Sequence, residues 1–202
     1  MKPTIICIDL EGVLIPEIWI AFAKKTGIKQ LELTTKDVED YNELMKMRLE
    51  ILYKNKLTLN HIKEVISTLN PLQGAASFIS WVRQRTQIVI LSDTFYDFAM
   101  PLMEKLNYPT LFCHSLKTDD NGFIKDYVLR TPDHKNKTVK AFKDLNFNTI
   151  AIGDSFNDIS MLKQAHKGIL FKAPDNVIKK YPDFEKLSDF DELIKHLENM
   201  LI

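Results

Sequence analysis

The sequence predicts an α/β fold in which a doubly wound, five-stranded parallel sheet is covered by helices on both faces. Three observations support this prediction. Short runs rich in Ile and Val recur along the chain, helical patterns alternate with them, and three of the runs end in polar groups. Runs that are apolar throughout are typical of strands buried on both faces. The expected strands are Thr4–Ile8, Gln87–Leu91, Thr110–Cys113, Thr149–Ile152 and Gly168–Phe171.

Helices are expected wherever apolar residues recur at a spacing of three or four. Such patterns stand before and after the second and fourth strands and close the chain. Their markers are Phe78, Trp81 and Val82, then Phe98, Leu102 and Leu106, then Val139, Phe142 and Leu145, then Ile159 and Leu162, and finally Leu193, Ile194, Leu197 and Leu201 within Ser188–Leu201. Strands that alternate with helices indicate an open, Rossmann-type sheet.

A long helical insertion interrupts this alternation after the first strand. Helices are expected at Glu17–Thr26, Tyr41–Leu52 and Leu59–Leu69, and Gly27 is a good stop for the first of them. We therefore expect a core domain over residues 1–14 and 71–202 and a small helical cap over 15–70. A hairpin signal, Asp119-Asp120-Asn121-Gly122, separates two strand-like pieces of Leu116–Arg130 and predicts a β-hairpin appendage.

Composition excludes several classes of function. The 202 residues include 27 Lys and Arg and 27 Asp and Glu, so no global charge favours nucleic acid or an anionic membrane. No apolar run approaches the length of a membrane span, and the N-terminus lacks a signal segment. The two cysteines, Cys7 and Cys113, lie in strand-like runs and are expected to be buried, reduced thiols. We expect a cytoplasmic enzyme.

Polar groups follow three of the expected strands. Asp9 and Glu11 follow the first, Ser92 the second and Asp154 the fourth. Ligands of open parallel sheets bind beyond the carboxyl ends of the strands, so these groups should converge on one edge. Each has an ordinary structural explanation, as a turn residue, a helix cap or an Asx turn. Those explanations are less convincing for all the positions together, and phosphoryl transfer through a carboxylate nucleophile accounts for them jointly.

These residues resemble the haloacid dehalogenase superfamily of phosphatases. Asp9-Leu10-Glu11-Gly12-Val13-Leu14 is similar to its first motif, and Ser92 in Leu91-Ser92-Asp93-Thr94 to its second. The most specific match is Gly153-Asp154-Ser155-Phe156-Asn157-Asp158, which resembles the fourth. Lys135 is the candidate for the third motif because it precedes a helix, and Lys137 is the competitor. One departure is that the family usually has aspartate where this chain has Glu11.

The resemblance implies a role for each residue. Asp9 would be the nucleophile, Glu11 the general acid and base, and Lys135 with the Ser92 hydroxyl would stabilise phosphate charge. It also implies Mg²⁺, held by Asp9, Asp154 and the backbone carbonyl of Glu11. Oxygen ligands of this kind suit that ion. Asp158 could hold a metal-bound water or orient Lys135, and we include it among the metal candidates.

Two charged residues of the insertion bear on the substrate. Arg48 falls in the apolar stripe of Tyr41–Leu52, where it either lies along apolar surface with its head in water or grips a carboxylate. Glu17 is either an acid favoured at a helix N-terminus or a partner for an ammonium. A carboxylate grip, an ammonium partner and a phosphate site together describe a phosphorylated amino acid.

The closer resemblance is to phosphoserine phosphatases, and in particular to the group that also transfers phosphate to homoserine. Glu11, Pro16-Glu17-Ile18-Trp19 and the segment from Leu91 to Tyr96 carry it. It implies phosphoserine as donor, with water or homoserine as acceptor. Asp93, Thr94 and Asn157 join the substrate-binding candidates. Asp93 stands where ordinary phosphoserine phosphatases have glycine, and the sequence assigns it no specific role.

Other interpretations stay open at this level. One rival is a phosphatase for another small phosphorylated metabolite, and a second is a catalytically silent Mg²⁺-binding regulatory protein. The five histidines show no metal-ligand spacing, so surface or hydrogen-bonded positions are expected for them. The sequence does not rank water against homoserine. An exposed apolar surface on the insertion could support a homodimer.

Overall fold

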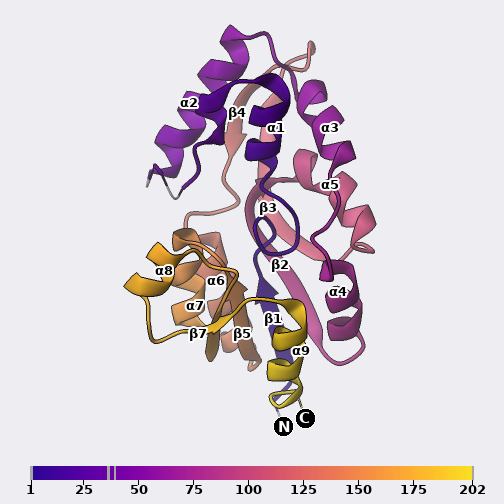
Figure 1. The fold of residues 1–202 in the computed structure, drawn as a ribbon, viewed down its shortest axis with the longest axis vertical. Coiled ribbons are helices and arrows are strands. Elements are labelled where there is room, and N and C mark those ends of the chain that lie inside the picture. Colours follow the sequence, from indigo (N-terminus) through magenta and orange to yellow (C-terminus); the bar gives the residue numbers. More distant parts are fainter. Residues whose placement is uncertain (1, 36, 39, 202) are drawn as a thin grey trace.

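The computed structural model describes residues 2–35, 37–38 and 40–201, and this part of the chain forms an α/β fold (Figure 1). The sheet order is β4-β3-β2-β1-β5-β6-β7, and every neighbouring pair is parallel except β3 with β4. The strands are β1 (Thr4–Ile8), β2 (Gln87–Phe95), β3 (Thr110–Thr118), β4 (Ile124–Val128), β5 (Asn148–Gly153), β6 (Lys167–Phe171) and β7 (Glu185–Leu187). The predicted doubly wound sheet is confirmed.

The predicted number of strands is wrong, because the sheet formed by the described residues has seven strands and not five. One additional strand, β4, is the second arm of the expected hairpin and pairs with an extended β3. The other, β7, is the three-residue sequence Glu-Lys-Leu, which pairs with β6 at the opposite edge. A segment so short and polar has no apolar run, so only its pairing with a neighbour identifies it as a strand.

Helices cover both faces of the sheet, as the alternating pattern predicted. Their bounds are α1 (Ile18–Thr26), α2 (Tyr41–Lys54), α3 (Leu59–Thr68), α4 (Ala75–Arg83), α5 (Tyr96–Lys105), α6 (His134–Asp144), α7 (Ile159–Gln164), α8 (Asp175–Lys180) and α9 (Phe190–Glu198), with short 3₁₀ helices η1 (Lys29–Glu32) and η2 (Phe156–Asp158). The last α-helix is shorter than the predicted Ser188–Leu201.

Successive side chains of β1 point to opposite faces and enter two separate cores. Ile6 and Ile8 belong to the core that also includes residues of α4, α5 and α9. Ile5 and Cys7 belong to the core that includes residues of α6, α7 and α8. Both faces of the central strand are therefore buried, which explains its continuous apolar sequence.

Helices α1, α2 and α3 lie together beyond the end of the sheet toward which β1 runs (Figure 1). Helix α1 ends at Gly27, whose positive φ of 74° suits glycine and whose N–H donates to the carbonyl of Ala23. Helix α2 begins after Asp40, whose carboxylate accepts hydrogen bonds from the N–H groups of Asn42 and Glu43. These helices fall in the range 15–70 that we proposed as a cap. Met1, Lys36, Glu39 and Ile202 of the proposed domain ranges lie outside the described residues.

The β3–β4 hairpin reaches from the sheet to these helices (Figure 1). The N–H of Leu59, at the start of α3, donates to the carbonyl of Gly122 in the hairpin turn over 2.9 Å. The Tyr127 hydroxyl of β4 donates to the side-chain oxygen of Asn42 in α2 over 2.6 Å. The hairpin is thus more than an appendage of the sheet, because it also supports the helical segment.

Strand β2 continues beyond its predicted end at Leu91. Its pairing with β3 is regular up to Leu91 and resumes only at Phe95, which lies opposite His114. The three residues between them, Ser92, Asp93 and Thr94, sit in the irregularity. Bulges of this kind redirect side chains and occur often beside active sites.

Two further expectations concern burial. Cys7 and Cys113 are both buried and not joined in a disulfide. Among the helices of the described residues, none combines the length and apolar character needed to cross a membrane.

Candidate active site

The polar groups at the strand ends converge as the sequence predicted. Asp9 follows β1, Asp154 follows the adjacent β5, and Ser92 lies in the irregular part of β2 on the other side of β1. All three are buried, with 4%, 3% and 2% of their surface exposed. The N–H of Asp9 donates to the carbonyl of Ile152 over 2.9 Å, which continues the β1–β5 ladder and places the two aspartates side by side.

Gly12 allows the loop after β1 to approach Asp154. Its φ of 79° lies in the left-handed region, and a Cβ there would stand 2.6 Å from Oδ2 of Asp154. Any larger residue would therefore be strained and would also collide with the carboxylate. The loop closes through the N–H groups of Leu14 and Ile15, which both donate to the carbonyl of Leu10. The glycine after Glu11 is a geometric requirement of the site.

Three carboxylates form a group that could bind a metal ion. Oxygen atoms of Asp9, Asp154 and Asp158 lie within 4.8 Å of one another, and all three residues are buried. Burial, followed by the Asp158 carboxylate, raises the pKa of Asp9 well above its ordinary value, although Lys135 opposes this effect. A hard divalent cation among these oxygens would offset their repulsion, so the donor set fits such an ion.

Lys135 places its ammonium among the carboxylates. It lies in the first turn of α6 and donates to Oδ1 of Asp9 over 2.9 Å and to Oδ1 of Asp158 over 2.8 Å. Burial lowers its pKa, but Asp158, Asp9 and Asp93 together raise it well above the ordinary value. The competitor, Lys137, is exposed and donates to the Thr131 hydroxyl over 3.0 Å. Of the two lysines, only Lys135 contacts the candidate nucleophile.

Asp158 uses both of its oxygens within the protein. One accepts from Lys135, and the other accepts from the backbone N–H groups of Asp154 and Ser155 over 3.0 and 3.2 Å. These contacts fix the turn after β5 and orient the lysine. The geometry therefore favours the second of the two roles that the sequence left open for Asp158.

Glu11 faces the start of α1. Its Oε2 accepts from the N–H of Ile18 over 2.9 Å, where a carboxylate is favoured by the helix dipole. Burial, followed by the nearby Glu17, raises the pKa of Glu11 to about 7, while the Ile18 hydrogen bond and Arg48 act in the opposite direction. A carboxyl group with such a pKa can both donate and accept a proton near neutral pH.

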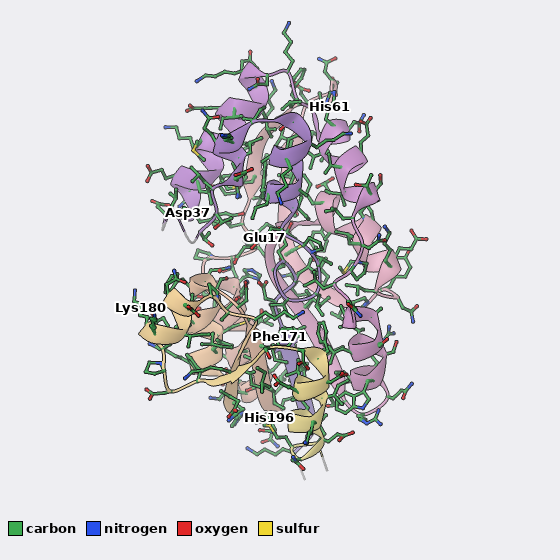
Figure 2. All side chains as sticks on the ribbon, viewed as in Figure 1. Glu17, Asp37, His61, Phe171, Lys180 and His196 are labelled. Atoms are coloured by element: carbon green, nitrogen blue, oxygen red, sulfur yellow. The ribbon has the colours of Figure 1, made fainter. Side chains whose placement is uncertain are left out.

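A cavity of about 70 Å³ joins the carboxylate group to the helical segment. Its walls combine strand-end and helical residues and include all six predicted substrate-binding residues. The lining residues are Asp9, Glu11, Glu17, Trp19, Thr34, Thr35, Tyr41, Leu44, Arg48, Ser92, Asp93, Thr94, Ser155 and Asn157. Glu17 lies at the junction between the helices and the sheet (Figure 2). Residues as far apart in the sequence as Asp9 and Asn157 thus enclose one cavity.

Arg48 reaches this cavity from α2 and is 5% exposed. Its guanidinium lies 4.4 Å from the centre of the Trp19 ring, and one terminal nitrogen donates to the carbonyl of Leu33 over 2.8 Å. Its Nε has no hydrogen-bond partner among the described residues. Burial lowers its pKa to about 10, against the opposing effect of Glu11. The arginine is held inside the protein, and its head does not extend into water.

A second cavity, of about 390 Å³, adjoins the first and shares Thr35, Tyr41, Asp93 and Asn157 with it. Its other walls are Asp133, His134, Lys135, Phe156, Lys180 and Tyr181. Lys180 belongs to α8, on the sheet side of the junction (Figure 2). Together the two cavities give room for a small molecule next to Asp9.

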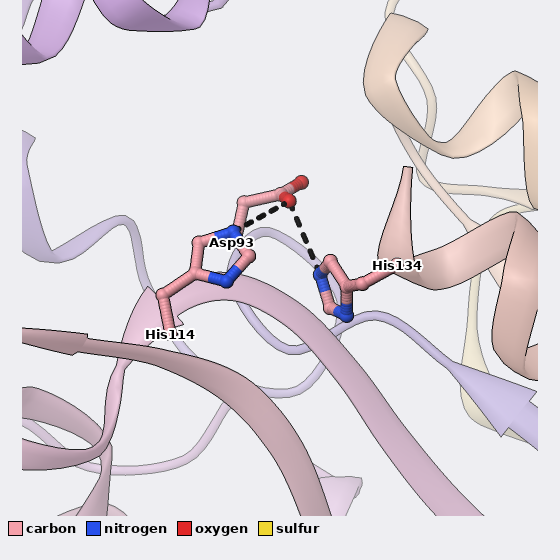
Figure 3. A group of neighbouring side chains, drawn as sticks. All are labelled: Asp93, His114 and His134. Carbon is pink, nitrogen blue, oxygen red and sulfur yellow. Dashed lines mark hydrogen bonds and ion pairs between the residues drawn. The ribbon is translucent and has the colours of Figure 1, made fainter. Parts of the chain in front are cut away.

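The structure also brings together residues that the sequence did not connect. His114 of β3 and His134 of α6 both contact Asp93 of β2, and both histidines are buried (Figure 3). Hydrogen-bonded histidines were expected, but their meeting at Asp93 was not. A signal was available in the sequence. His114 directly follows the expected strand Thr110–Cys113, and Asp93 stands where the motif of ordinary phosphoserine phosphatases has glycine.

The fold and the site define a class of enzyme. A family model described as haloacid dehalogenase-like hydrolase matches residues 3–166, and a second with the same description matches residues 146–192. The chain belongs to the haloacid dehalogenase-like hydrolases, which confirms the resemblance seen in its motifs.

Within that family, two curated relatives are especially similar. Phosphoserine phosphatase ThrH of Pseudomonas aeruginosa is 55% identical over 189 residues, which cover 94% of this chain and 92% of the relative. A phosphoserine phosphatase of Pseudomonas syringae pv. tomato is 56% identical over 191 residues, covering 95% and 81% of the two chains.

Solved structures share the fold at lower sequence identity. A crystal structure of phosphoserine phosphatase in apo form has a TM-score of 0.78 at 23% identity, covering 96% of this chain and 98% of that one. A phospho-aspartyl intermediate analogue of phosphoserine phosphatase has a TM-score of 0.78 at 21% identity, covering 97% and 99%. These similarities extend over nearly the whole chain.

Proposed function

We propose that this protein is a Mg²⁺-dependent phosphoserine phosphatase that acts through an aspartyl phosphate on Asp9. The observation that carries the proposal is the buried contact between Asp9 and Lys135, at 2.9 Å, beside a cavity that Glu11 also lines. The two relatives named as phosphoserine phosphatases, at 55% and 56% identity, support the choice of substrate. One of the fold relatives is a phospho-aspartyl analogue, which agrees with the proposed intermediate.

In the first step, a carboxylate oxygen of Asp9 attacks phosphorus. The bond between phosphorus and the serine oxygen breaks, and that oxygen takes the proton of the Glu11 carboxyl group, so that serine leaves. The pKa of Glu11, raised by burial to about 7, allows it to carry this proton near neutral pH. Lys135 and the Ser92 hydroxyl stabilise the charge on the phosphoryl oxygens.

In the second step, Glu11 takes a proton from water. The water oxygen attacks phosphorus, and the bond to Asp9 breaks to restore its carboxylate and release phosphate. Because Glu11 returns to its protonated state, the cycle consumes one water for each phosphoserine. The burial of Asp9 and Lys135 limits the access of other water to the site.

The residues that would hold Mg²⁺ are Asp9, Asp154 and the backbone carbonyl of Glu11, with Asp158 fixing the turn beneath them. The close approach of Gly12 to Asp154 and the oxygen-only donor set fit this ion. When bound, it would neutralise the repulsion between the nucleophile and an anionic phosphate.

The amino-acid part of the substrate would lie against the helical segment. Arg48 would grip its carboxylate, which is supported by the burial of the guanidinium in the cavity wall and by the unpartnered Nε. Glu17, in the same wall, would meet its ammonium. In this proposal residues 15–70 act as a cap that closes over the substrate.

Homoserine is proposed as a second acceptor in place of water. The larger cavity supports this. Lys135, which contacts the candidate nucleophile Asp9, is part of its wall, and it shares wall residues with the smaller cavity. The homoserine hydroxyl would give its proton to Glu11 and attack phosphorus, which would yield phosphohomoserine and free Asp9.

The alternative, a different small phosphorylated metabolite as donor, would use the same chemistry. A cytoplasmic location and a homodimer stay predictions from the sequence.

Phosphate release from L-phosphoserine with Mg²⁺ tests the proposal. We expect turnover that EDTA abolishes, that added Mg²⁺ restores and that Asp9→Asn eliminates. With homoserine present, phosphohomoserine should form at the expense of free phosphate. If the protein ignores phosphoserine but hydrolyses other phosphates in the same Asp9-dependent way, the substrate assignment is wrong.

Two comparisons between matched variants or substrates test the roles proposed for Lys135 and Arg48. Lys135→Ala should lower kcat by about a hundredfold or more, and Lys137→Ala should change it little, because only Lys135 contacts Asp9. Arg48→Ala should weaken turnover of phosphoserine but leave turnover of a phosphate monoester without a carboxylate unchanged. Equal losses on both substrates would show that Arg48 supports the fold and does not select the substrate.

A further inference from the structure

Asp93 lies at the centre of a cluster that the proposed mechanism does not use (Figure 3). Its Oδ1 is 3.2 Å from Nε2 of His134 and 3.4 Å from Nε2 of His114. The two histidines are each 2% exposed. A carboxylate with two imidazoles is a set that could bind a metal ion, and it could equally be a hydrogen-bond network. The positions of the imidazole protons decide between these two possibilities.

The backbone fixes the proton of His114. The N–H of Arg130 donates to its Nδ1 over 3.2 Å, so this nitrogen is an acceptor. In a neutral imidazole the proton is then on Nε2, which faces Asp93. A metal ion on Nε2 would require the proton on Nδ1, where it would oppose the Arg130 N–H. The cluster is therefore better suited to hydrogen bonding than to binding a metal.

The other oxygen of Asp93 faces the active site. Oδ2 lies 3.2 Å from the ammonium of Lys135 and accepts a hydrogen bond from Nδ2 of Asn157 over 2.6 Å. With the two histidines, the carboxylate has four polar neighbours. His134 and Asn157 are hydrogen-bonded to it, and His114 and Lys135 lie within ion-pair distance. Asp93 is the one residue that contacts both buried histidines and both of these site residues, among those that the structure describes.

Lys135 has three N–H groups and three carboxylate neighbours. Two of these, Asp9 and Asp158, belong to the group that would bind Mg²⁺, and the third is Asp93. Without Asp93, the carboxylate contacts of the Lys135 ammonium would be those with Asp9 and Asp158. The third contact, from the irregular part of β2 where Ser92 also lies, keeps the ammonium on the side where phosphate oxygens would be.

We propose that Asp93, held in place by His114 and His134, is a positioning residue that fixes Lys135 and Asn157 at the phosphate site. The inference deepens the proposed function and rests on it for its kinetic consequences. It gives a role to the aspartate that replaces the glycine of ordinary phosphoserine phosphatases. It also explains why two buried imidazoles point at one carboxylate oxygen.

The kinetic test compares Asp93→Asn with Asp144→Asn. Asp144 ends the same helix α6 that carries Lys135, but it lines neither cavity, and its carboxylate accepts from the exposed Lys140. We expect Asp93→Asn to lower kcat for phosphoserine by about tenfold to a hundredfold, the range seen when groups that orient site residues are lost. KM should change far less, and Asp144→Asn should stay near wild type. Similar kinetics for the two variants, or a rise in KM with kcat unchanged, would overturn the inference.

A second pair of variants tests the histidine contact. His134→Gln keeps a side-chain N–H that can donate to Asp93, whereas His134→Leu has none. The inference predicts that His134→Gln keeps most of the wild-type kcat and that His134→Leu loses about as much as Asp93→Asn. Equal losses in the glutamine and leucine variants would contradict the proposed donor role.

The proton positions can be tested without any turnover. Long-range ¹H–¹⁵N spectra of the wild-type protein should show His114 as the Nε2–H tautomer, and its signals should shift in Asp93→Asn but not in Asp144→Asn. Added Zn²⁺ should leave both imidazoles unchanged. An Nδ1–H tautomer of His114, or Zn²⁺ shifts at both rings, would overturn the network. If phosphoserine is not turned over, the proposed function fails while this test of the network stands.

Discussion

Individual residues decide how closely the parts of the site approach. Gly12 permits contact between the loop after β1 and Asp154, because its φ of 79° and missing Cβ leave the carboxylate where it is. Lys135 then balances part of the negative charge of the aspartates. The chemistry of the site therefore depends on one small residue as much as on the charged ones.

Gly12→Ala should damage both stability and activity. The positive φ would cost about 1–3 kcal/mol of unfolding free energy, and displacement of Asp154 should lower kcat about a hundredfold. Gly27→Ala is the matched control, because its φ is 74° but its added Cβ would have no atom within 4 Å. Urea unfolding and phosphoserine turnover measure both variants. A fully active Gly12→Ala enzyme would show that the close approach is unimportant.

His134 should make stability depend on pH. Burial, with Lys135 and His114, lowers its pKa in the folded protein below the ordinary value of 6.5, although Asp93 opposes the shift. Between these two pKa values the unfolded chain binds more protons, so stability is fully present above about 6.5 and is lost as the pH falls. Unfolding free energies from urea titrations at neutral and mildly acidic pH should show a smaller acid loss in His134→Gln. An unchanged pH slope would contradict this sign.

Sequence reasoning at the residue scale worked where a motif kept its spacing. Asp9, Ser92 and Asp154 could be placed at strand ends, and the expected convergence is confirmed by their burial at adjacent strands. The meeting of His114 and His134 was not predicted, because they lie 20 residues apart on different elements. Their rings, with centroids 4.7 Å apart, come together beside Asp93 only in the folded chain.

At the scale of elements, strand β2 shows what a pattern of apolar residues can and cannot indicate. The run Gln87–Leu91 correctly identified the strand, but the sequence did not reveal that pairing with β3 fails between Leu91 and Phe95. The break is a shift in the register between β2 and β3, so it depends on both strands and cannot be seen in the sequence of β2 alone. It is also what turns Ser92 and Asp93 toward the site.

Helix α2 carries Arg48 and Tyr41 into the site, and its N-terminus depends on Asp40. Asp40→Ala removes the acceptor for two backbone N–H groups and should cost about 1 kcal/mol of unfolding free energy. Asp40→Asn, which keeps a capping oxygen, should cost much less. Urea unfolding of the two variants tests this, and equal losses would show that the charge of Asp40 matters more than its hydrogen bonds.

At the scale of the whole molecule, the site lies at the point where the strand order switches sides. Strands β2 to β4 are added on one side of β1, and β5 to β7 are added on the other. Strand β1 lies between β2 and β5, so its carboxyl end adjoins both Ser92 and Asp154. Strong alternation of apolar runs and helical patterns made this architecture predictable. The short strand β7 and helix α8 were not predicted, since neither has an apolar run long enough to identify it.

The central claim is that phosphate passes through Asp9, and a quenched reaction tests it most directly. The protein would be mixed with L-phosphoserine and Mg²⁺, stopped with acid during turnover, digested and analysed by mass spectrometry. We predict a phosphorylated peptide that contains Asp9, that loses its phosphate in hydroxylamine and that is absent from Asp9→Asn. Rapid turnover with no phosphate on this peptide, or phosphorylation that persists in Asp9→Asn, would contradict the account.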